Sequence, residues 1–565
     1  VCVREVHGGE LEVMNQVVSV PLEGGTSGGE QGVLVTGSDF YSNPRISPDG
    51  RRLCWLSWDL PNMPWDGCEL WVADVLPDGS LGGPTLVAGG KTEWVFQPDW
   101  SPGRASARAE PVEERRGQSV RGQADVAQAG RDSGLYFVAE SANWANLYRW
   151  RDGRVEAMAE GEAEFATPQW VFGMRTYGFV PTGGGRIVCA YNQRGRWTLG
   201  SLDTESKRLT PYDLPFTEFS GVRVAPLPAH GEPACPERSR RIEGRADGSA
   251  AVFIAGSPRY PSAVVKLDVA SGKFEVLRTA MGAIPDAAYL SEPLSVEFPT
   301  EGGRTAHAFY YHPKNRDYDG PRGQKPPLLV KVHGGPTGSA SMSLDLRTQF
   351  WTSRGFAVLD VNYGGSTGYG REYRHRLNGT WGVLDVDDCV NGAEYLVRRG
   401  AVDGERMAIE GGSSGGYLTL CALTFRKVFK AGASYYGFGD IEALAKDFHK
   451  FESRYVDTLV GPYPQARTKY IERSPIYFTR GLNCPVIFFQ GLEDTVVLPG
   501  QSEEMAAALR EKGLPVAHLT FEGEGHGFRQ ASTIKRCLDA ELYFFSKVFG
   551  FTPADTLEPV AIENL

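Results

Sequence analysis

A glycine-rich stretch in the second half of the chain has the residue types and spacing of a serine nucleophile. Residues Arg406–Leu420 run from an apolar, strand-like segment through Gly-Gly-Ser-Ser-Gly-Gly into a helix-like segment. A Gly-x-Ser-x-Gly motif in this setting holds its serine on a strained turn, which requires small residues two positions before and after it. Ser413 and Ser414 both satisfy this rule, and the residues alone leave the choice between them nearly even. A glycine-rich helix start that only packs or binds phosphate is the competing interpretation.

An acid and a histidine follow the serine pair in the chain order typical of α/β-hydrolases. Asp494 comes just after the apolar segment Val486–Gln490, and Glu493 beside it is an alternative acid. His526 lies between two glycines in the loop after the next apolar segment. A single histidine is more often structural, but its place after a serine and an acid predicts a catalytic base.

These three residue types together can activate a hydroxyl group. His526 would accept the serine proton and pass it to the leaving group, while Asp494 would fix the imidazole tautomer and stabilise its charged form. The oxyanion that develops needs backbone donors, each worth roughly 3–4 kcal/mol. With Ser413 as nucleophile, we expect the Ser414 N–H to be one donor and the Gly335 N–H to be the second.

The second oxyanion donor belongs to the segment Val332-His-Gly-Gly-Pro-Thr337, at the end of an apolar run. Glycine at this point lets the backbone approach a substrate closely. His333 in the same segment could be mistaken for a metal ligand, but no second ligand has suitable spacing, so we expect it to shape the loop. No metal site and no organic cofactor are predicted.

Strand-like and helix-like segments alternate from about residue 291 onward. The helix-like segment Asp385–Arg398 has one apolar stripe with a period of about 3.6 residues, and Ser502–Lys512 and Thr533–Val548 are similar. This alternation predicts a mostly parallel sheet covered by helices on both faces, with functional groups at the carboxyl ends of its strands. We place an α/β-hydrolase domain at 291–552 and a C-terminal tail at 553–565. The strand-like segments are Leu328–His333, Phe356–Asn362, Arg406–Glu410, Ala431–Tyr435, Val486–Gln490 and Ala517–Phe521.

Residues 1–290 have a different pattern, in which short apolar, strand-like segments are separated by Gly, Pro, Asp and Asn. Three segments open alike, at Asn43, Gln97 and Thr167, and their spacing corresponds to a blade of about 40–50 residues once long inserts are subtracted. Repeated four-stranded units predict an all-β propeller. A β-sandwich with coincidental Ser-Pro turns is the alternative.

Two segments interrupt the predicted propeller, near 104–133 and 226–248. The first is rich in Arg, Glu, Gln, Gly and Ala without apolar periodicity, and the second contains Cys-Pro-Glu-Arg-Ser-Arg-Arg. Neither can bury enough apolar surface to offset its ordering entropy, so both are predicted to be exposed insertions.

The composition excludes several classes of protein. The 565 residues exceed what one core usually serves, and 41% hydrophobic with 23% charged residues is ordinary for a globular protein. A net charge of −10 disfavours nucleic acid or a membrane surface as partner. Nine scattered cysteines favour a reducing, cytoplasmic location over a disulfide framework. The chain starts at Val1 without Met, so the sequence leaves a removed signal peptide open.

The combined motifs resemble the prolyl oligopeptidase family of serine peptidases, in particular its acylaminoacyl-peptidase-like branch. In that family the nucleophile stands four residues before the tyrosine, which selects Ser413 over Ser414. The family also places a β-propeller before the hydrolase domain, where it restricts access to short peptides. The matching segments are His333–Pro336, Asn362–Gly370, Trp381–Asp388, Gly411–Tyr417, Gly491–Asp494 and Gly525–Gly527.

The chain departs from the family pattern in two ways, which concern the number of propeller blades and the residues that bind substrate. We count roughly four blades plus a strand pair near Val1–Pro21, fewer than the family's usual seven, so the propeller is predicted to be incomplete. Many relatives carry an Arg two residues after the catalytic Asp to grip a substrate carbonyl, whereas this chain has Val496. Arg454 is a candidate to replace this arginine, and Glu452 is a candidate to bind a substrate amine. For both residues, a salt bridge on the surface is the alternative.

The resemblance implies hydrolysis of short peptides, as an oligopeptidase or as an acylaminoacyl- or dipeptidyl-peptidase type. An esterase using the same triad, or a non-catalytic propeller scaffold, are the alternatives. The sequence leaves open the residue preference, endo- against exo-cleavage, a free against an acylated N-terminus, and the oligomeric state, with a homo-oligomer as one option.

Overall fold

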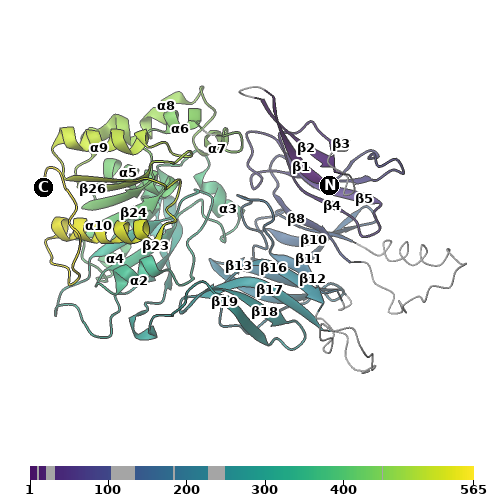
Figure 1. The fold of residues 1–565 in the computed structure, drawn as a ribbon, viewed down its shortest axis with the longest axis horizontal. Helices are drawn as coiled ribbons and strands as arrows, with labels where there is room; N and C mark the ends of the chain where they lie inside the picture. Colours follow the sequence, from purple (N-terminus) through teal and green to yellow (C-terminus); the bar gives the residue numbers. More distant parts are fainter. Residues whose placement is uncertain (9–11, 21–31, 103–133, 182–184, 227–247, 448) are drawn as a thin grey trace, which may run out of the picture. The chain divides into compact units, whose positions relative to one another are not determined.

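The computed structural model describes residues 1–8, 12–20, 32–102, 134–181, 185–226, 248–447 and 449–565 (Figure 1). Its contacts divide the chain into unit 1, Val1–Ser257 with Ser262–Gly282, and unit 2, Pro258–Pro261 with Ala283–Leu565. The domain limits drawn from the sequence remain predictions. The predicted insertions at 104–133 and 226–248 lie outside the described residues, apart from Pro226 and Gly248.

Unit 1 consists of consecutive strands that form separate small sheets, which confirms the predicted β-propeller architecture. A three-stranded sheet contains β1 (Cys2–Gly8), β2 (Glu12–Ser19) and β3 (Gly32–Val35). The first two four-stranded blades are β4 (Phe40–Ile46), β5 (Arg52–Trp58), β6 (Glu69–Asp74) and β7 (Thr85–Gly89), then β8 (Val95–Trp100), β9 (Leu135–Ala139), β10 (Asn146–Arg151) and β11 (Arg154–Ala159). The next two are β12 (Tyr177–Phe179), β13 (Arg186–Gln193), β14 (Arg196–Asp203) and β15 (Leu209–Pro211), then β16 (Glu218–Pro226), β17 (Ser249–Ser257), β18 (Tyr260–Asp268) and β19 (Phe274–Thr279).

Alternating side chains explain why these segments form strands that stack. In β18, Ala263, Val265 and Leu267 are buried while Ser262 and Val264 are exposed, which is the two-residue period of a half-buried strand. The buried set joins one apolar core with side chains of the preceding blade.

The three similar segments begin at different places in their blades. Asn43 and Gln97 lie in β4 and β8, the first strands of their blades. Thr167 lies in the connection between β11 and β12, because a Thr-Pro dipeptide fits a turn as well as it fits the start of a strand.

Unit 2 is built around an eight-stranded sheet in the order β20-β21-β23-β22-β24-β25-β26-β27. The pairs from β23 to β27 in this order are parallel, whereas β20 and β21 add an antiparallel edge. The strands are β20 (Leu294–Thr300), β21 (Arg304–Tyr311), β22 (Leu328–Val332), β23 (Ala357–Asn362), β24 (Met407–Gly412), β25 (Ala431–Tyr435), β26 (Val486–Gly491) and β27 (Val516–Phe521).

Helices cover both faces of this sheet, as predicted for an α/β-hydrolase domain. Ala431 and Ala433 of β25 pack into the core that contains Trp351 of α2 and Phe545 of α10. Gly432 between them faces Leu423 of α5 on the other side, and Figure 1 shows β24 and β26 between α5 and α10. The helices are α2 (Leu346–Thr352), α3 (Arg371–Arg374), α4 (Leu384–Arg398), α5 (Ser414–Phe425), α6 (Ile441–Asp447), α7 (Tyr455–Leu459), α8 (Arg467–Glu472), α9 (Gly500–Lys512) and α10 (Ala531–Phe549).

The chain end packs on unit 2 beside β27. Backbone hydrogen bonds join Val516 and Glu563 in both directions, with N–O distances of 3.0 and 2.9 Å. Among the described residues, no helix is long and apolar enough to cross a bilayer. The predicted cytoplasmic location stays a prediction.

Candidate active site

Ser413, His526 and Asp494 come together at the carboxyl edge of the unit 2 sheet. Ser413 follows β24, Asp494 follows β26 and His526 follows β27, so three strands of one parallel sheet position them. The imidazole Nε2 of His526 lies 2.8 Å from the Ser413 Oγ, and its Nδ1 lies 2.8 Å from an Asp494 carboxylate oxygen. A hydroxyl, an imidazole and a carboxylate in this order can transfer a proton away from the hydroxyl.

The backbone conformation distinguishes the two candidate nucleophiles, Ser413 and Ser414. Ser413 has φ 57° and ψ −124°, a strained conformation that a side chain other than glycine rarely adopts. Ser414 is the first residue of α5 and is buried. The hydrogen bond between His526 and the serine pair involves Ser413, so the geometry favours Ser413 as the nucleophile.

The glycines around this turn are required by close backbone contacts. A Cβ on Gly411 would lie 2.4 Å from the carbonyl group of Gly415, and a Cβ on Gly415 would lie 2.4 Å from the Val332 oxygen. Both contacts are with backbone atoms that cannot rotate away. The tight approach of β24, the turn and α5 therefore depends on these two glycines.

The Asp494 carboxylate is fully buried and is fixed by its own loop. One oxygen accepts hydrogen bonds from the Val496 and Val497 N–H groups, both at 2.9 Å, while the other faces His526. The ring of Tyr436 packs edge-on against the imidazole, with centroids 5.0 Å apart. These contacts hold the imidazole in one orientation.

The loop that carries Gly335 approaches the nucleophile closely. A Cβ on neighbouring Gly334 would lie 3.4 Å from the Ser413 Cβ, and Gly335 itself has φ 123°. Within the described residues, neither the Gly335 nor the Ser414 backbone N–H donates to a protein acceptor. Both residues line one pocket with Ser413.

The same loop is held by a partly buried histidine and a tyrosine. His333 contacts the Ser366 hydroxyl at 2.8 Å and stacks on the ring of Tyr363. Burial lowers the pKa of His333 to about 4, so the ring is neutral near pH 7. The Tyr455 hydroxyl lies 2.6 Å from the Thr337 Oγ1 at the other end of the loop.

A small, largely apolar pocket of about 30 Å³ opens beside Ser413. Sequence reasoning did not assign its apolar wall, although Phe438 stands three residues after the last residue of β25, at the end of the strand where this kind of sheet presents functional groups. The wall consists of Trp381, Phe438, Leu444, Tyr455, Val456, Val496 and Val497.

The two predicted substrate-binding residues have different positions. Glu452 lines this pocket, its side chain is 14% exposed, and its carboxylate lies 3.0 Å from the His449 imidazole. Arg454 does not line the pocket, and its guanidinium pairs with Asp457 in the first turn of α7.

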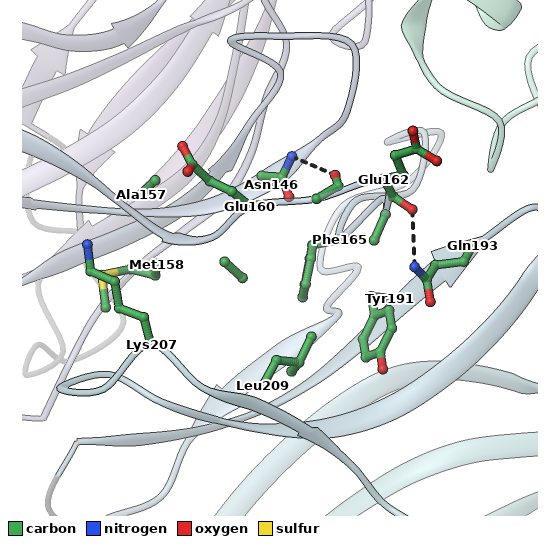
Figure 2. Close-up of a pocket in the computed structure, with 13 residues that line it drawn as sticks. Asn146, Ala157, Met158, Glu160, Glu162, Phe165, Tyr191, Gln193, Lys207 and Leu209 are labelled. Atoms are coloured by element: carbon green, nitrogen blue, oxygen red, sulfur yellow. Dashed lines mark hydrogen bonds between the residues drawn. The ribbon is translucent and has the colours of Figure 1, made fainter.

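A larger cavity of about 380 Å³ lies in unit 1 (Figure 2). It is lined by Phe165, Tyr191 and Leu209 together with Glu160 and Glu162. Its lining has no serine or histidine, so it offers no nucleophile and base of the kind found in unit 2.

Comparison with known proteins identifies the family of this chain. The prolyl oligopeptidase family model matches residues 342–552. The structure of a puromycin-hydrolyzing peptidase of Mycobacterium tuberculosis superimposes with a TM-score of 0.85 at 37% identity, covering 100% of this chain and 78% of that one. The chain belongs to the prolyl oligopeptidase family. This membership confirms the resemblance and the two-part fold inferred from the sequence motifs.

Other members of the prolyl oligopeptidase family are also similar. A puromycin hydrolase structure has 34% identity and a TM-score of 0.84, covering 99% of this chain and 78% of that one. Dipeptidyl aminopeptidase BIII of Pseudoxanthomonas mexicana is 31% identical over 42% of this chain, and an acylamino-acid-releasing enzyme of Arabidopsis thaliana is 29% identical over 37%. These matches span only 36% and 29% of the two relatives' own lengths.

Proposed function

We propose that this protein is a serine peptidase that cleaves short peptides through an acyl-enzyme formed on Ser413. The observation that carries the proposal is the continuous contact from the Ser413 hydroxyl through His526 to the buried Asp494 carboxylate, at 2.8 Å for each step. Family membership supports the same conclusion, since the family consists of serine peptidases.

The proposed reaction has two halves that use the same groups. The Ser413 Oγ attacks the peptide carbonyl carbon while His526 Nε2 takes the hydroxyl proton, and the C–N bond then breaks as the imidazolium returns that proton to the leaving amine. Water attacks the resulting ester with His526 again as base, which releases the acid and restores Ser413. Asp494 stays ionised and stabilises the imidazolium in both halves.

The Ser414 and Gly335 N–H groups are proposed to stabilise the oxyanion. Both border the pocket beside Ser413 and neither has an acceptor within the described residues. Donors that are fixed before the reaction need no reorganisation when negative charge develops. The apolar wall of the pocket is proposed to receive a substrate side chain.

The position of Glu452 supports the proposal that the substrate has a free α-amine. Its carboxylate is largely buried in the wall of the pocket that contains Ser413, and a substrate ammonium group there would form a charge-assisted hydrogen bond. The names of the similar proteins include both a dipeptidyl aminopeptidase and acylamino-acid-releasing enzymes. We propose that this chain is of the first kind and removes residues from free N-termini.

The test is hydrolysis of one fluorogenic peptide amide with a free and with an acetylated N-terminus. We expect a higher kcat/KM for the free amine, and we expect Glu452→Gln to lower that value by roughly tenfold or more while leaving the acetylated substrate unchanged. Ser413→Ala should abolish both activities, and Ser414→Ala, which keeps the backbone N–H, should retain them. Equal rates on the two substrates would contradict the amine preference, and undiminished activity of Ser413→Ala would contradict the mechanism.

A further inference from the structure

The first strands of three blades in unit 1 share a charged position. A β-bulge interrupts β4, β8 and β16 where each pairs with the second strand of its blade, and the residue directly after the bulge is charged. A bulge is a built feature that re-aims a side chain. The charged residues are Arg45, Asp99 and Arg223, and each stands two positions after a residue with positive φ, namely Asn43 at 50°, Gln97 at 47° and Gly221 at 66°.

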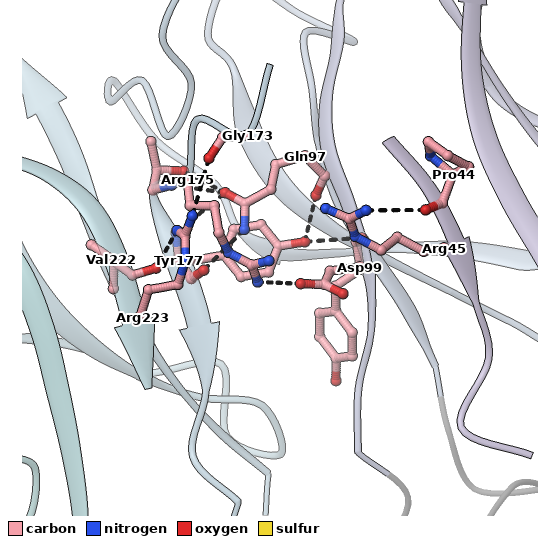
Figure 3. Close-up of polar contacts among 11 residues, drawn as sticks. Pro44, Arg45, Gln97, Asp99, Gly173, Arg175, Tyr177, Val222 and Arg223 are labelled. Atoms are coloured by element: carbon pink, nitrogen blue, oxygen red, sulfur yellow. Dashed lines mark hydrogen bonds and ion pairs between the residues drawn. The ribbon is translucent and has the colours of Figure 1, made fainter. Parts of the chain in front are cut away.

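A fourth charged side chain comes from just before β12. Arg175 also stands two residues after a positive-φ position, Gly173 at 80°. Its guanidinium forms an ion pair with Asp99, and its backbone carbonyl accepts a 3.2 Å hydrogen bond from Val222 N of the next blade. Arg45, Arg175, Arg223 and Asp99 are called the arginine cluster below, and Figure 3 shows their side chains pointing into the same region.

The surroundings hold the cluster in place across blades. The Gln97 Nε2 donates to the Tyr177 carbonyl at 2.9 Å, and the Tyr177 hydroxyl donates to the Gln97 carbonyl at 2.7 Å. Both side chains are buried, so β8 and β12 are fixed against each other two residues away from Asp99 and Arg175 along the chain. The arginine cluster is thus presented by a rigid part of the propeller.

The arginine cluster carries more positive than negative charge. The four residues of the cluster have three guanidinium groups and one carboxylate, so their charges sum to two positive charges in excess. Of the three arginines, Arg175 forms the ion pair with Asp99. Arg45 donates to the Pro44 carbonyl at 3.0 Å, and Arg223 donates to the Val222 and Gly173 carbonyls at 3.2 and 3.1 Å. Carbonyl groups satisfy donors without neutralising charge.

Two further observations indicate that the cluster could accept an anionic ligand. The Nε of Arg175 is buried and has no acceptor among the described residues. Burial lowers the pKa of Arg223, and the neighbouring Arg175 and Arg45 lower it further, against a smaller opposing effect of Asp99. Partly buried like charges repel one another, so a bound anion would stabilise this arrangement.

We propose that the arginine cluster is a binding site for an oxyanion, either a carboxylate or a phosphate. The planar fork of a guanidinium matches two oxygens of either group, and three forks from different blades can surround one ligand. Solvent reaches the site, because the Arg175 and Asp99 side chains are 19% and 18% exposed and Arg223 is exposed. The site lies wholly in unit 1 and does not depend on the proposed peptidase activity.

The first experiment titrates inorganic phosphate into the full chain at low ionic strength by calorimetry. We expect saturable binding that weakens about tenfold in Arg223→Gln, which loses a charged donor, and strengthens in Asp99→Asn, which loses a competing carboxylate. Arg223 is exposed and bonds only to carbonyls, so its variant should fold normally. Arg278→Gln, an exposed arginine of β19 without an ion pair in the described chain, is the matched control and should bind like wild type.

Weaker phosphate binding in Arg223→Gln together with stronger phosphate binding in Asp99→Asn would not result if these residues only stabilised the fold. Absence of phosphate binding to the wild-type protein, or equal weakening in Arg223→Gln and Arg278→Gln, overturns the proposal. A melting curve of each variant without phosphate separates loss of folding from loss of the site.

The second experiment distinguishes the two oxyanion sources and rests on the proposed peptidase function. A tripeptide acid and its C-terminal amide compete with phosphate for the Ser413→Ala protein, in which turnover is removed. Displacement by the acid alone assigns the site to a peptide carboxylate, and displacement by neither assigns it to inorganic phosphate. If the wild-type protein cleaves no peptide at all, the phosphate titration still tests the oxyanion site.

Discussion

Asp494 has no contact with Ser413, and its proposed role is to act through the imidazole between them. Its carboxylate accepts from the histidine Nδ1 and from two backbone N–H groups of its own loop. An amide in its place could donate to Nδ1 and would then favour the wrong imidazole tautomer. Asp494→Asn should therefore keep KM nearly constant and lower kcat by about 10,000-fold, measured on the free-amine peptide. A loss of less than about tenfold would show that the carboxylate is not needed for proton transfer.

A buried carboxyl outside the site predicts a pH dependence of stability. Asp385, in the first turn of α4, is fully buried, and burial raises its pKa from the ordinary 3.8 to about 7. The folded chain keeps a proton at this carboxyl that the unfolded chain releases from about pH 4 upward, so the free energy of unfolding falls as pH rises towards 7. Asparagine cannot ionise, so Asp385→Asn should gain in Tm relative to wild type between pH 5 and pH 8.

The control for this comparison is Asp319→Asn, which changes an exposed aspartate of unit 2. Its Tm relative to wild type should be the same at both pH values. If the Tm difference between Asp385→Asn and wild type were also the same at pH 5 and pH 8, the Asp385 carboxyl would lose its proton as readily in the folded chain as in the unfolded chain.

The sequence was sufficient to bring three residues of the site together, but it was not sufficient to choose between two serines. Chain order and strand ends predicted Asp494 and His526, because the fold places the carboxyl ends of parallel strands at one edge. The choice of Ser413 needed either the family likeness or its φ of 57°. Arg454 was a candidate to replace the arginine that many relatives carry at the position of Val496, but its guanidinium pairs with Asp457 and does not line the pocket.

Among the secondary-structure elements, the turn between β24 and α5 limits the site most directly. A methyl group on Gly415 would collide with the Val332 oxygen of the neighbouring strand at 2.4 Å. Gly415→Ala should lower the free energy of unfolding by about 1–3 kcal/mol, measured by chemical denaturation, and should lower kcat/KM as the turn shifts. Gly500→Ala, at the start of α9 with open space around it, is the matched control and should change neither quantity. Equal stability of the two variants would mean that the turn can relax.

The long amphipathic helix and the buried parallel strands were predicted well, whereas the short helices and the edge strands were not. The segment Asp385–Arg398 was predicted within a residue of α4, because burial of one face imposes an apolar stripe with a helical period on it. The segment Ala431–Tyr435 was predicted with the bounds of β25, whose five residues are all buried. The antiparallel edge strands β20 and β21 were missed, as were α6 to α8. Helices of five to seven residues present too few turns to show a stripe, and their position depends on tertiary contacts.

At the scale of the whole molecule, a propeller unit accompanies the hydrolase unit in one chain. The family likeness implies that such a propeller limits access to short peptides. We therefore expect efficient cleavage of a short peptide and negligible cleavage of casein, a long chain with little folded structure, measured by release of new amines. Unfolded casein removes substrate structure as a reason for resistance, so efficient digestion would show that access is open.

We propose that Ser413, and no other serine, becomes the nucleophile because His526 and Asp494 lie behind it. The most direct test is to treat the protein with a fluorophosphonate and locate the adduct by peptide mass spectrometry. We predict one adduct on Ser413 in the wild-type protein and in Ser414→Ala, no adduct in Ser413→Ala, and a greatly slowed reaction in His526→Ala. An adduct on Ser414, or undiminished labelling of Ser413→Ala, would contradict the account.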